Sequence, residues 1–358
     1  MRADASFSTD KRIAFVIASS VLGGHELQCA ELVKLAKDLC RATVYLNRPE
    51  HERLFRGIEG LEVVIAEDSF FKAGKLPVQV LRGIHRSSLH RRRFAEYDRV
   101  IICAGAVEAS LEPAIALLFT GKADLYLPFI YDRTSIYGWL GAPYTCLLRM
   151  LVNLFGAVIT INRIQAKLIS RFYRGRTFFV RNKIGVVEPA ATAVAGRKLV
   201  TIGRLDRQKR VAELVNALDY ADNPFKVLMV IGDGPLRREV QCAAERARHI
   251  RVEMVGWLDF HEQAQVLSRH DVLVLNSIIE GEPMVVREAN ARNMAVVVPD
   301  IDGMRGITSK ANRFTGSSDL REKIAQAYRG ALVIKRVYSE SRLDGQRRRQ
   351  FSCYLSGC

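Results

Sequence analysis

Two glutamates stand eight residues apart in one segment of the second half of the chain. The segment reads Glu280-Gly-Glu-Pro-Met-Val-Val-Arg-Glu288 and follows the apolar run Val272–Leu275 after a short loop. Pro283 suits the first turn of a helix, because it lacks the N–H that would be unpaired there. Gly281 to Val285 would then present backbone N–H groups that attract phosphate, while the carboxylates accept hydrogen bonds from sugar or ribose hydroxyls. Alone, the segment fits an acidic loop and a solvated helix residue at least as well.

A basic turn follows the first strand-like run of the same half. Gly203-Arg-Leu-Asp-Arg-Gln-Lys209 comes directly after Leu199–Ile202. Arg204 and Lys209 therefore leave the carboxyl end of a predicted strand, where two cations could offset the charge that develops on a departing diphosphate. Gly232-Asp-Gly-Pro235 follows the next run, and this turn pattern is more often structural than functional.

A glycine pair near the N-terminus closes the first predicted turn. Gly23 and Gly24 lie between the apolar run Ile13–Ala18 and an amphipathic stretch that begins near His25. This order predicts a strand, a glycine turn and a helix. Glycines there would let the backbone approach a phosphate or an acceptor, although a simple turn uses the same pair.

The remaining pattern predicts an α/β protein with two doubly wound, Rossmann-like domains. Apolar strand-length runs alternate with helix-length segments in both halves, which favours parallel sheets covered on both faces. The small-residue stretch 190–196 predicts a linker, so we expect domains at 1–190 and 191–358, the second with a basic tail. Two such domains facing a central cleft would gather ligands at the carboxyl ends of their strands. The expected strands are Ile13–Ala18, Thr43–Leu46, Glu62–Ala66, Val100–Cys103, Leu125–Tyr131, Val158–Ile161, Phe178–Val180, Leu199–Ile202, Val227–Ile231, Val252–Val255, Val272–Leu275 and Val296–Val298.

Composition excludes several classes of protein. The 358 residues are 49% apolar and 26% charged, values that disfavour disorder and collagen. Seven scattered cysteines without a CxxC pair argue against a disulfide framework and a zinc knuckle, and favour a reducing cytoplasm. No secretory h-region is visible, and no uncharged stretch reaches the ~18 apolar residues of a membrane span. We expect a cytoplasmic protein with peripheral contact to the inner membrane face.

The charge is strongly positive and unevenly placed. The net charge is +16, and no Asp or Glu occurs between Arg133 and Val187 or between Lys72 and Arg93. Nucleic acid, an anionic leaflet and a phosphorylated substrate all suit such a chain, and so does a solvated face. Tyr137, Trp139 and neighbouring aliphatic residues beside bases suit an anionic membrane surface. Their helical spacing is equally typical of a core helix.

Together these elements resemble the retaining glycosyltransferases of the GT-B class, most closely family 4, often called glycosyltransferase group 1. The resemblance rests on Gly203 to Lys209, Gly232 to Pro235, the pair Glu280 and Glu288, and Gly23-Gly-His-Glu26. It implies the GT-B fold and transfer of a sugar, with retained configuration, from a nucleotide-diphosphate sugar. The implied acceptor is a glycan such as lipopolysaccharide, capsule or another lipid-linked saccharide.

The resemblance also implies roles for single residues. Arg204 and Lys209 would hold the donor diphosphate, Glu280 would contact the sugar hydroxyls, and these three form the expected catalytic set. Glu288 would bind the ribose. No metal and no cofactor are expected, since the nucleotide sugar is a substrate. The expected donor-binding residues are Gly23, Gly24, Gly203, Gly281, Glu282, Val285, Val286 and Glu288.

Some positions depart from the family pattern. Glu282 replaces an aromatic or aliphatic residue and would add an acid near the sugar. Asn293 replaces a glycine that commonly ends the following helix, and it tolerates the same left-handed backbone. The family's first-domain histidine is absent, and Tyr131 or Asp132 stands near its place. Gly306 stands where relatives have a glutamate.

Two other functions stay open from sequence. A nucleotide-sugar epimerase or a phosphorylase could use the same architecture. A nucleic-acid-binding protein would explain the charge, but it would leave the acidic segment unexplained, and no RNP or helix-turn-helix signature is present. A dehydrogenase is disfavoured because no GxGxxG follows either leading strand. The seven histidines show no zinc-ligand spacing and are expected on the surface or in helix packing.

Overall fold

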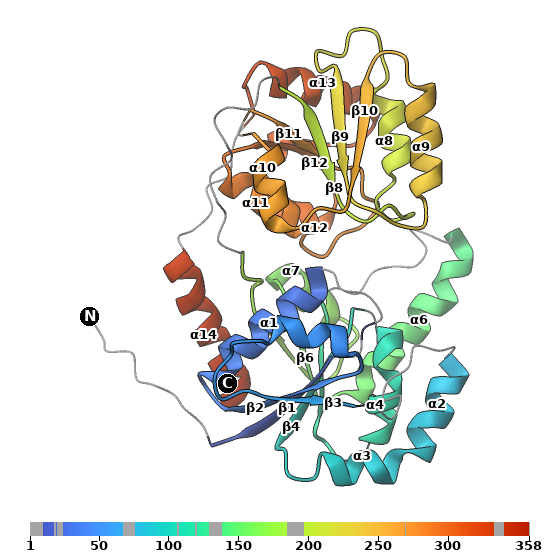
Figure 1. Cartoon of the computed structure of the whole chain (residues 1–358). Coiled ribbons are helices and arrows are strands. Elements are labelled where there is room, and N and C mark those ends of the chain that lie inside the picture. Colours follow the sequence, from blue (N-terminus) through green and yellow to red (C-terminus); the bar gives the residue numbers. More distant parts are fainter. Residues whose placement is uncertain are drawn as a thin grey trace. The chain divides into compact units, whose positions relative to one another are not determined.

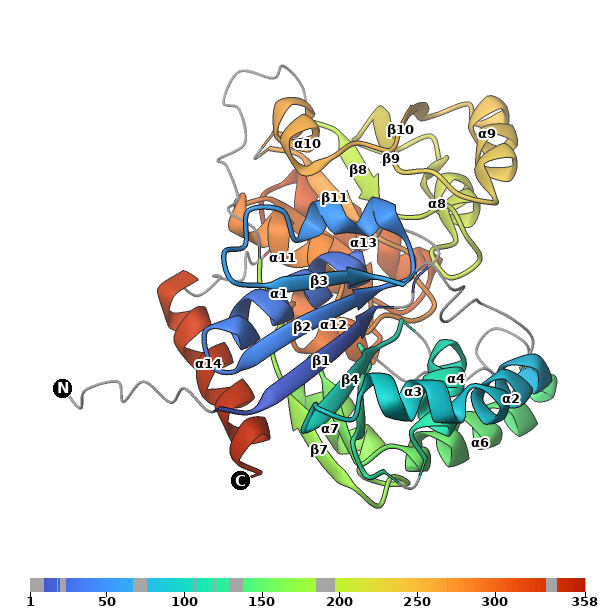
Figure 2. The ribbon, with the colours of Figure 1, turned by 60° about the horizontal axis from the view of Figure 1, so that its bottom comes forward.

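The computed structural model describes residues 10–17, 19, 24–66, 76–105, 107–118, 120–128, 138–184, 197–268, 270–332 and 340–357. The chain forms two compact units (Figures 1 and 2). The first joins Met1–Thr134, Trp139–Lys183 and Ser339–Cys358, and the second joins Ser135–Gly138 and Ile184–Tyr338. Each unit holds one parallel sheet with helices on both faces, so the predicted α/β class with two Rossmann-like folds is confirmed.

The first unit contains a seven-stranded sheet in the order β3-β2-β1-β4-β5-β6-β7. Central β1 is apolar and buried along its length after Arg12, because both of its neighbours and both helical layers cover it. Ile13 is paired with Ala42 on one side and with Arg99 on the other. The strands are β1 Arg12–Ile17, β2 Arg41–Leu46, β3 Glu62–Ile65, β4 Arg99–Cys103, β5 Ala123–Tyr126, β6 Ala157–Thr160 and β7 Arg176–Phe179.

Two helical layers bury the faces of this sheet. In α1, the residues Cys29, Leu32, Val33 and Ala36 recur at helical spacing and are buried on one face together with side chains of α14. Side chains of α4, α6 and α7 bury the other face. The helices are α1 Gly24–Lys37, η1 Pro49–Leu54, α2 Leu76–His85, α3 Ser87–Arg93, η2 Val107–Ser110, α4 Leu111–Ala116, η3 Gly138–Leu140, α6 Gly141–Leu151, η4 Val152–Leu154, α7 Arg163–Ile169 and α14 Glu340–Ser356.

The C-terminal tail, which the sequence placed with the second domain, belongs to the first unit. Its helix α14 buries Phe351, Tyr354 and Leu355 against α1 and β7. The Tyr354 hydroxyl donates a hydrogen bond to the buried Asp124 carboxylate at 2.6 Å. Asp124 also accepts a hydrogen bond from the Arg99 guanidinium. In the tail, few apolar residues stand among many arginines, and their spacing shows no clear helical period. The contribution of the tail to the core was therefore not predicted.

The second unit contains a six-stranded sheet in the order β10-β9-β8-β11-β12-β13. Five of its strands match the predicted apolar runs. The sixth, β13, is only two residues long and pairs with β12, which is too short for a hydrophobic pattern to reveal. The strands are β8 Leu199–Ile202, β9 Val227–Ile231, β10 Arg251–Gly256, β11 Val272–Val274, β12 Ala295–Pro299 and β13 Arg313–Phe314.

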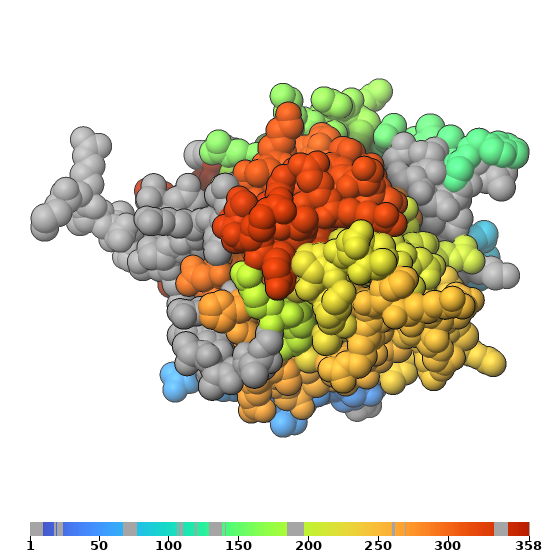
Figure 3. All heavy atoms as spheres, turned by 90° about the horizontal axis from the view of Figure 1, so that it is seen from above, coloured from blue at the N-terminus to red at the C-terminus, as the bar shows by residue number. Residues whose placement is uncertain are grey.

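Helices also cover both faces of the second sheet. Side chains of α8, α9 and α13 form one core layer, and those of α11 and α12 form the other. Figure 3 shows the outer side chains of α13 in red beside the yellow and gold segments that hold α8 and α9. The helices are α8 Val211–Leu218, α9 Arg237–Arg246, α10 Phe260–Val266, α11 Met284–Ala291, α12 Asp302–Arg305, η5 Lys310–Asn312 and α13 Ser317–Tyr328.

The strand order reverses once in each sheet, between β1 and β4 and between β8 and β11. Loops that leave such neighbouring strands run in opposite directions, so a crevice forms at their carboxyl ends where ligands of open α/β sheets bind. In the second unit, the loop after β8 carries Lys209 and the loop after β11 carries Glu280. The topology therefore directs both predicted catalytic segments to one point of one sheet.

Replacement of Phe351 by Ala tests the attachment of the tail. The ring is fully buried in the first unit, so its loss should lower the free energy of unfolding of this unit by about 3–5 kcal/mol. Arg349→Ala, at an exposed position of the same helix, should change it by no more than about 0.5 kcal/mol. Urea denaturation followed by circular dichroism measures both. Equal stability of the two variants would show that α14 does not belong to the folded core.

Candidate functional site

Glycine turns join the carboxyl ends of β8 and β9. Gly232 has a φ of +142°, and a Cβ atom there would lie 1.9 Å from the carbonyl oxygen of Gly203. A Cβ atom on Gly234 would lie 2.4 Å from the carbonyl oxygen of Leu205. Leu205 N–H donates to the Asp233 carbonyl at 3.0 Å. Only glycine allows these close approaches, so the Gly-Asp-Gly segment holds the basic turn in place.

The basic turn is also fastened to the loop after β11. Asp206 Oδ1 accepts from the backbone N–H groups of Gln208 and Lys209 at 3.0 and 3.1 Å, which closes the turn. Gln208 then binds that loop in both directions, accepting from Ile278 N–H at 2.9 Å and donating to the Ile279 carbonyl at 2.8 Å. These bonds fix the backbone from which Lys209 projects.

Lys209 and Glu280 meet at the centre of this arrangement. The Lys209 ammonium forms an ion pair with Glu280 Oε1, and the Ser277 hydroxyl donates to the same oxygen at 2.7 Å. Behind the glutamate, a Cβ atom on Gly303 would lie 2.2 Å from the Glu280 carbonyl oxygen, so α12 packs closely on this loop. Among the described residues, none donates a hydrogen bond to Oε2 of Glu280. That oxygen keeps its capacity to accept hydrogen bonds.

A small hollow lies next to this pair. The hollow is open to solvent and borders the carboxyl ends of β8, β9 and β11. Its lining includes Gly203, Lys209, Ile231, Asn276 and Ser277. The predicted residues Gly203 and Lys209 therefore border one space, together with Asn276 and Ser277, which sequence reasoning did not single out.

Arg204 is placed differently from Lys209. Its side chain is exposed, and its nearest carboxylate is Asp206 at 4.0 Å. The structure thus brings Lys209 and Glu280 into contact and leaves Arg204 on the solvent side of the same turn. An exposed guanidinium is available to an anion from solution, whereas Lys209 is already paired.

The helix after Glu280 begins one residue later than predicted. Pro283 is the N-cap of α11, and Met284 is its first residue. The Val286 side chain is buried in the core, and its N–H donates to the Pro283 carbonyl at 3.1 Å. This N–H is therefore engaged within the turn, whereas the expectation of free N–H groups concerns Gly281 to Val285 and stays a prediction. Gly281 is buried, and the Val285 side chain is partly buried.

Glu282 has a structural partner that the sequence analysis missed. Arg287 donates to Glu282 at 2.6 Å, and both side chains are buried. The expected additional acid near a sugar is thus neutralised by a cation five residues further along the chain, on α11. The pair spans the helix start, so it fixes the loop that carries Glu280.

Glu288 lies on α11 and is partly buried. Burial raises the pKa of its carboxyl group, and the nearby Arg292 guanidinium opposes this rise. Such a carboxylate is poorly solvated, so it has more to gain from hydrogen bonds with an incoming ligand than an exposed carboxylate has.

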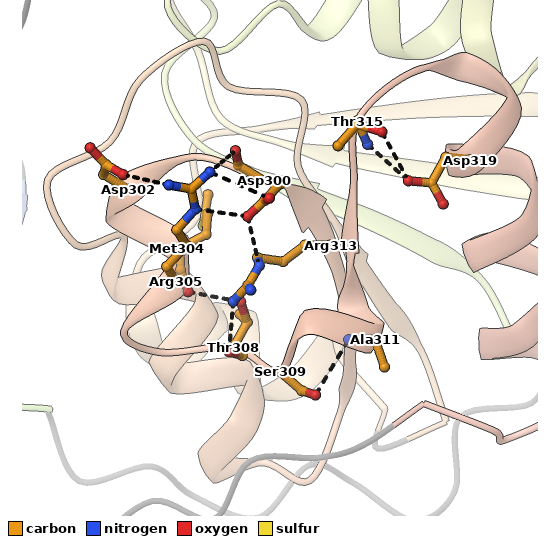
Figure 4. Close-up of polar contacts among 10 residues, drawn as sticks. All are labelled: Asp300, Asp302, Met304, Arg305, Thr308, Ser309, Ala311, Arg313, Thr315 and Asp319. Carbon is orange, nitrogen blue, oxygen red and sulfur yellow. Dashed lines mark hydrogen bonds and ion pairs between the residues drawn. The ribbon is translucent and has the colours of Figure 1, made fainter.

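The carboxylates of the Asp-x-Asp pair, Asp300 and Asp302, form ion pairs with arginines. Asp300 accepts from Arg305 at 3.0 Å and pairs with Arg313 at 2.8 Å, while Arg305 also reaches Asp302 at 3.0 Å (Figure 4). The hydrogen bond from Arg305 lowers the pKa of Asp300, and Arg313 adds to this effect. No group of three or more His, Cys, Asp or Glu side chains in the described part of the chain could hold a metal ion.

The carboxyl edge of the first sheet carries a histidine that the sequence analysis assigned to packing or surface. Gly24 is the first residue of α1, and His25 follows it on the same turn. The His25 ring stacks on Tyr126 with centroids 5.8 Å apart, and its Nε2 lies 3.4 Å from Cys29 Sγ. Burial lowers the His25 pKa. No spacing in the sequence indicates this position. Gly23, Tyr131 and Asp132 lie outside the described residues.

Arg287→Met tests whether the Glu282 pair is structural. The substitution leaves a buried carboxylate without its cation and should cost about 3–5 kcal/mol of unfolding free energy. The double variant Glu282→Met with Arg287→Met removes both charges and should recover most of that loss. Chemical denaturation of the three proteins measures the effect. A double variant as unstable as the single one would contradict this assignment.

Comparisons with known proteins find sequence similarity mainly in the second unit. Residues 190–333 match the family described as "Glycosyl transferases group 1". TuaC of Bacillus subtilis (strain 168), a glycosyltransferase assigned to teichuronic acid biosynthesis, is 31% identical over 137 residues, which cover 38% of this chain and 32% of TuaC. The UDP-Gal:α-D-GlcNAc-diphosphoundecaprenol α-1,3-galactosyltransferase of Escherichia coli is 28% identical over 121 residues, 32% of this chain and 30% of that enzyme.

These alignments span about a third of the length of the curated relatives. The structural likeness extends further. HepE of Anabaena, solved in complex with UDP-glucose, has a TM-score of 0.68 and 18% identity over 97% of this chain and 100% of that chain. This likeness concerns the fold. Residues 190–333 therefore match the glycosyl transferases group 1 family model, and the fold of the chain is like that of solved GT-B glycosyltransferases.

Proposed function

We propose that the chain is a hexosyltransferase that moves a sugar from a nucleotide-diphosphate sugar to an acceptor glycan with retention of configuration. The observation that carries this proposal is the cluster of Lys209, Glu280 and Ser277 at the switch point of the second sheet, inside the matched region. The cluster places a cation that can bind a phosphate in direct contact with a carboxylate whose second oxygen can accept hydrogen bonds from sugar hydroxyls.

The geometry divides these two tasks between neighbouring atoms. Glu280 Oε1 receives Lys209 and Ser277, which fixes the carboxylate plane and leaves Oε2 to accept from donor hydroxyls. The β-phosphate of a donor close to the Lys209 ammonium would interact with it while the ammonium stays paired with Glu280. Exposed Arg204 would supply the second cation. Charge that grows on the leaving diphosphate would then be stabilised where it develops.

The chemical step balances without a protein base. The bond between the anomeric carbon and the diphosphate oxygen breaks, and a bond to the acceptor hydroxyl oxygen forms on the same face. The acceptor proton passes to an oxygen of the leaving phosphate. Glu288 would hold the ribose hydroxyls of the donor. We propose no metal, since Asp300 and Asp302 are held by arginines and diphosphate charge can be balanced by Lys209 and Arg204.

The acceptor is proposed to be a lipid-linked saccharide at the cytoplasmic face of a membrane. Its support is the basic, acid-free character of long segments of the first unit and the similarity to an enzyme named for a diphosphoundecaprenol-linked acceptor. In the described part of the chain, no helix is both long enough and apolar enough to cross a bilayer.

Substitutions at Lys209 and Glu280 test the division of roles. Lys209→Ala should weaken donor and free UDP binding about 10- to 100-fold, because a partly buried phosphate contact is lost. Glu280→Gln should leave UDP binding within about twofold and lower kcat/KM about 100-fold, since it affects contacts with the sugar. Arg207→Ala, at an exposed position of the same turn, is the matched control. Calorimetry with UDP and UDP-sugars, and acceptor-dependent sugar transfer, are the measurements.

The same assays separate the competing functions. If the protein epimerises the sugar of the donor without an acceptor, its function is that of an epimerase and not of a transferase. If it binds a random oligonucleotide tightly and does not respond to nucleotide sugars, a nucleic acid is its partner. If Lys209→Ala binds donor as the control does, the proposed diphosphate site is wrong. Transfer that is lost in EDTA and restored by a divalent cation would contradict the metal-independent reaction.

Glu288→Gln should improve stability and impair donor binding. A carboxyl whose pKa is raised on folding stabilises the native state only while protonated, so this contribution is lost as pH rises through the folded pKa. At about pH 7.5, well above the pKa of an unfolded glutamate, the neutral amide of the variant should raise Tm, and the gain should vanish below about pH 4. Donor-induced thermal stabilisation should fall because a ribose acceptor is weakened. Exposed Glu239→Gln is the control. A lower Tm at about pH 7.5 would contradict the burial argument.

A further inference from the structure

Two residues other than glycine in the described part of the chain have a positive φ, Arg210 and Asn293. Asparagine commonly adopts the left-handed conformation just after a helix, as Asn293 does after α11, whereas arginine rarely does. Arg210 has a φ of 48° and a ψ of 49°, and it directly follows Lys209. A sparsely populated backbone conformation next to a site residue persists only where the surrounding structure holds it in place.

The helix that begins after Arg210 does not require an arginine at this position. Arg210 is the N-cap of α8, and N-caps favour Ser, Thr, Asp and Asn, whose side chains accept hydrogen bonds from the first N–H groups of a helix. The Arg210 side chain makes no such bond. Glycine would adopt the left-handed backbone without a steric cost. The reason for an arginine here therefore lies in the contacts of its guanidinium.

The Arg210 guanidinium binds the loop after β11. Its Nε donates to the Asn276 carbonyl at 3.1 Å, and its Nη2 donates to Asn276 Oδ1 at 3.0 Å. In return, the Asn276 side-chain amide donates to the Arg210 carbonyl at 3.4 Å. Asn276 is buried and lines the hollow beside Lys209. The Arg210–Asn276 pair therefore joins the end of the basic turn to the wall of the hollow.

Lys209 lies between two residues that bind this loop. Gln208 precedes it and Arg210 follows it, and each of them both donates hydrogen bonds to the loop and accepts one from it. Lys209 itself pairs with Glu280 of the same loop. The backbone is thus fixed on both sides of Lys209, and the direction in which its ammonium projects depends on both neighbours.

We propose that Arg210 is a positioning residue, which directs the Lys209 ammonium toward a bound phosphate by holding Asn276. The catalytic consequence rests on the proposed function, because Lys209 would stabilise the charge of the leaving diphosphate there. A catalytic group that is misplaced by about 1 Å can lower a rate about 100-fold. An arginine that acted only through its charge would be replaceable by lysine, whereas two directed hydrogen bonds require the planar guanidinium.

The acetylation rate of Lys209 measures its positioning without any donor. The full chain is treated with acetic anhydride, and mass spectrometry compares Lys209 with exposed Lys226 of the same unit. Lys209 is partly buried and paired, so in the parent it should react about tenfold more slowly than Lys226. Arg210→Gly permits the left-handed backbone, and Arg210→Lys keeps the charge. Both lose the paired hydrogen bonds and should raise the Lys209 rate about five- to tenfold.

Two further variants serve as controls for the acetylation experiment. Asn293→Gly makes the same kind of change at the other left-handed position and should leave the Lys209 rate unchanged. Asn276→Ala added to Arg210→Gly should change the rate less than about twofold, because both substitutions remove the same contact.

Sugar transfer by the same variants tests the consequence for the reaction. Arg210→Gly and Arg210→Lys should lower kcat about 10- to 100-fold and change the donor KM no more than about threefold. The ammonium would still meet the diphosphate, but it would be misplaced for the charge that develops in the transition state. Asn293→Gly should leave both parameters unchanged.

Three results would overturn the proposal. They are parental Lys209 reactivity in both Arg210 variants, parental reactivity and kcat in Arg210→Lys, and a raised donor KM with unchanged kcat, which would mean that Arg210 contacts the donor itself. A parent that neither binds UDP-sugars nor transfers sugar would contradict the proposed function instead. The acetylation rates would then still decide whether Arg210 positions Lys209.

Discussion

The contact between Lys209 and Glu280 is the constraint on which the second unit's site depends. An ion pair at the edge of a core loses hydration, and its attraction offsets this loss only when both groups are held in good geometry. Here the geometry comes from the backbone. Gly232 and Gly234 bring the loops after β8 and β9 into contact, Gln208 ties the basic turn to the loop after β11, and Gly303 supports Glu280 from behind. A diphosphate that binds Lys209 would share the ammonium with Glu280, and the loops would not need to move.

Carboxylates around this point fall into two groups. Glu282 and Asp300 are each satisfied by an arginine from their own segment, so they support the loops. Glu280 keeps one oxygen without a donor among the described residues, and Glu288 is partly buried with a raised pKa. The two carboxylates of the Glu280 to Glu288 motif thus differ from Glu282 between them, which is paired with Arg287.

Much of the fold was predictable, because continuous apolar runs marked twelve strands, eleven of them to within two residues at each end. The predicted run Leu125–Tyr131 extends past β5, which ends at Tyr126. The sequence could not show partners that depend on folding. Arg287 is an ordinary helix residue until α11 places it against Glu282, and His25 shows no pattern that would set it beside Tyr126. The tail was misassigned because Phe351 and Tyr354 find their core only after the chain returns to the first unit. The exposure of Leu81 and Ile84 on α2 was likewise hidden, since a hydrophobic period shows that a helix is amphipathic and does not say which side is buried.

Burial of acids makes the surface of the first unit more basic than its composition alone requires. Asp124 lies in the interior with Arg99 and Tyr354, and Glu112 lies in the interior near Arg86 and His90. Each removes a negative charge from the surface, while the exposed arginines of α3 and α6 stay at the boundary with solvent. The second unit instead keeps its acids Glu280 and Glu288 at the carboxyl edge of its sheet. One chain thus carries two different electrostatic surfaces, a basic one with exposed apolar groups and a mixed one built around paired loops. A polyanion such as nucleic acid would suit only the first, whereas a sugar diphosphate meets both cations and hydroxyl acceptors in the second.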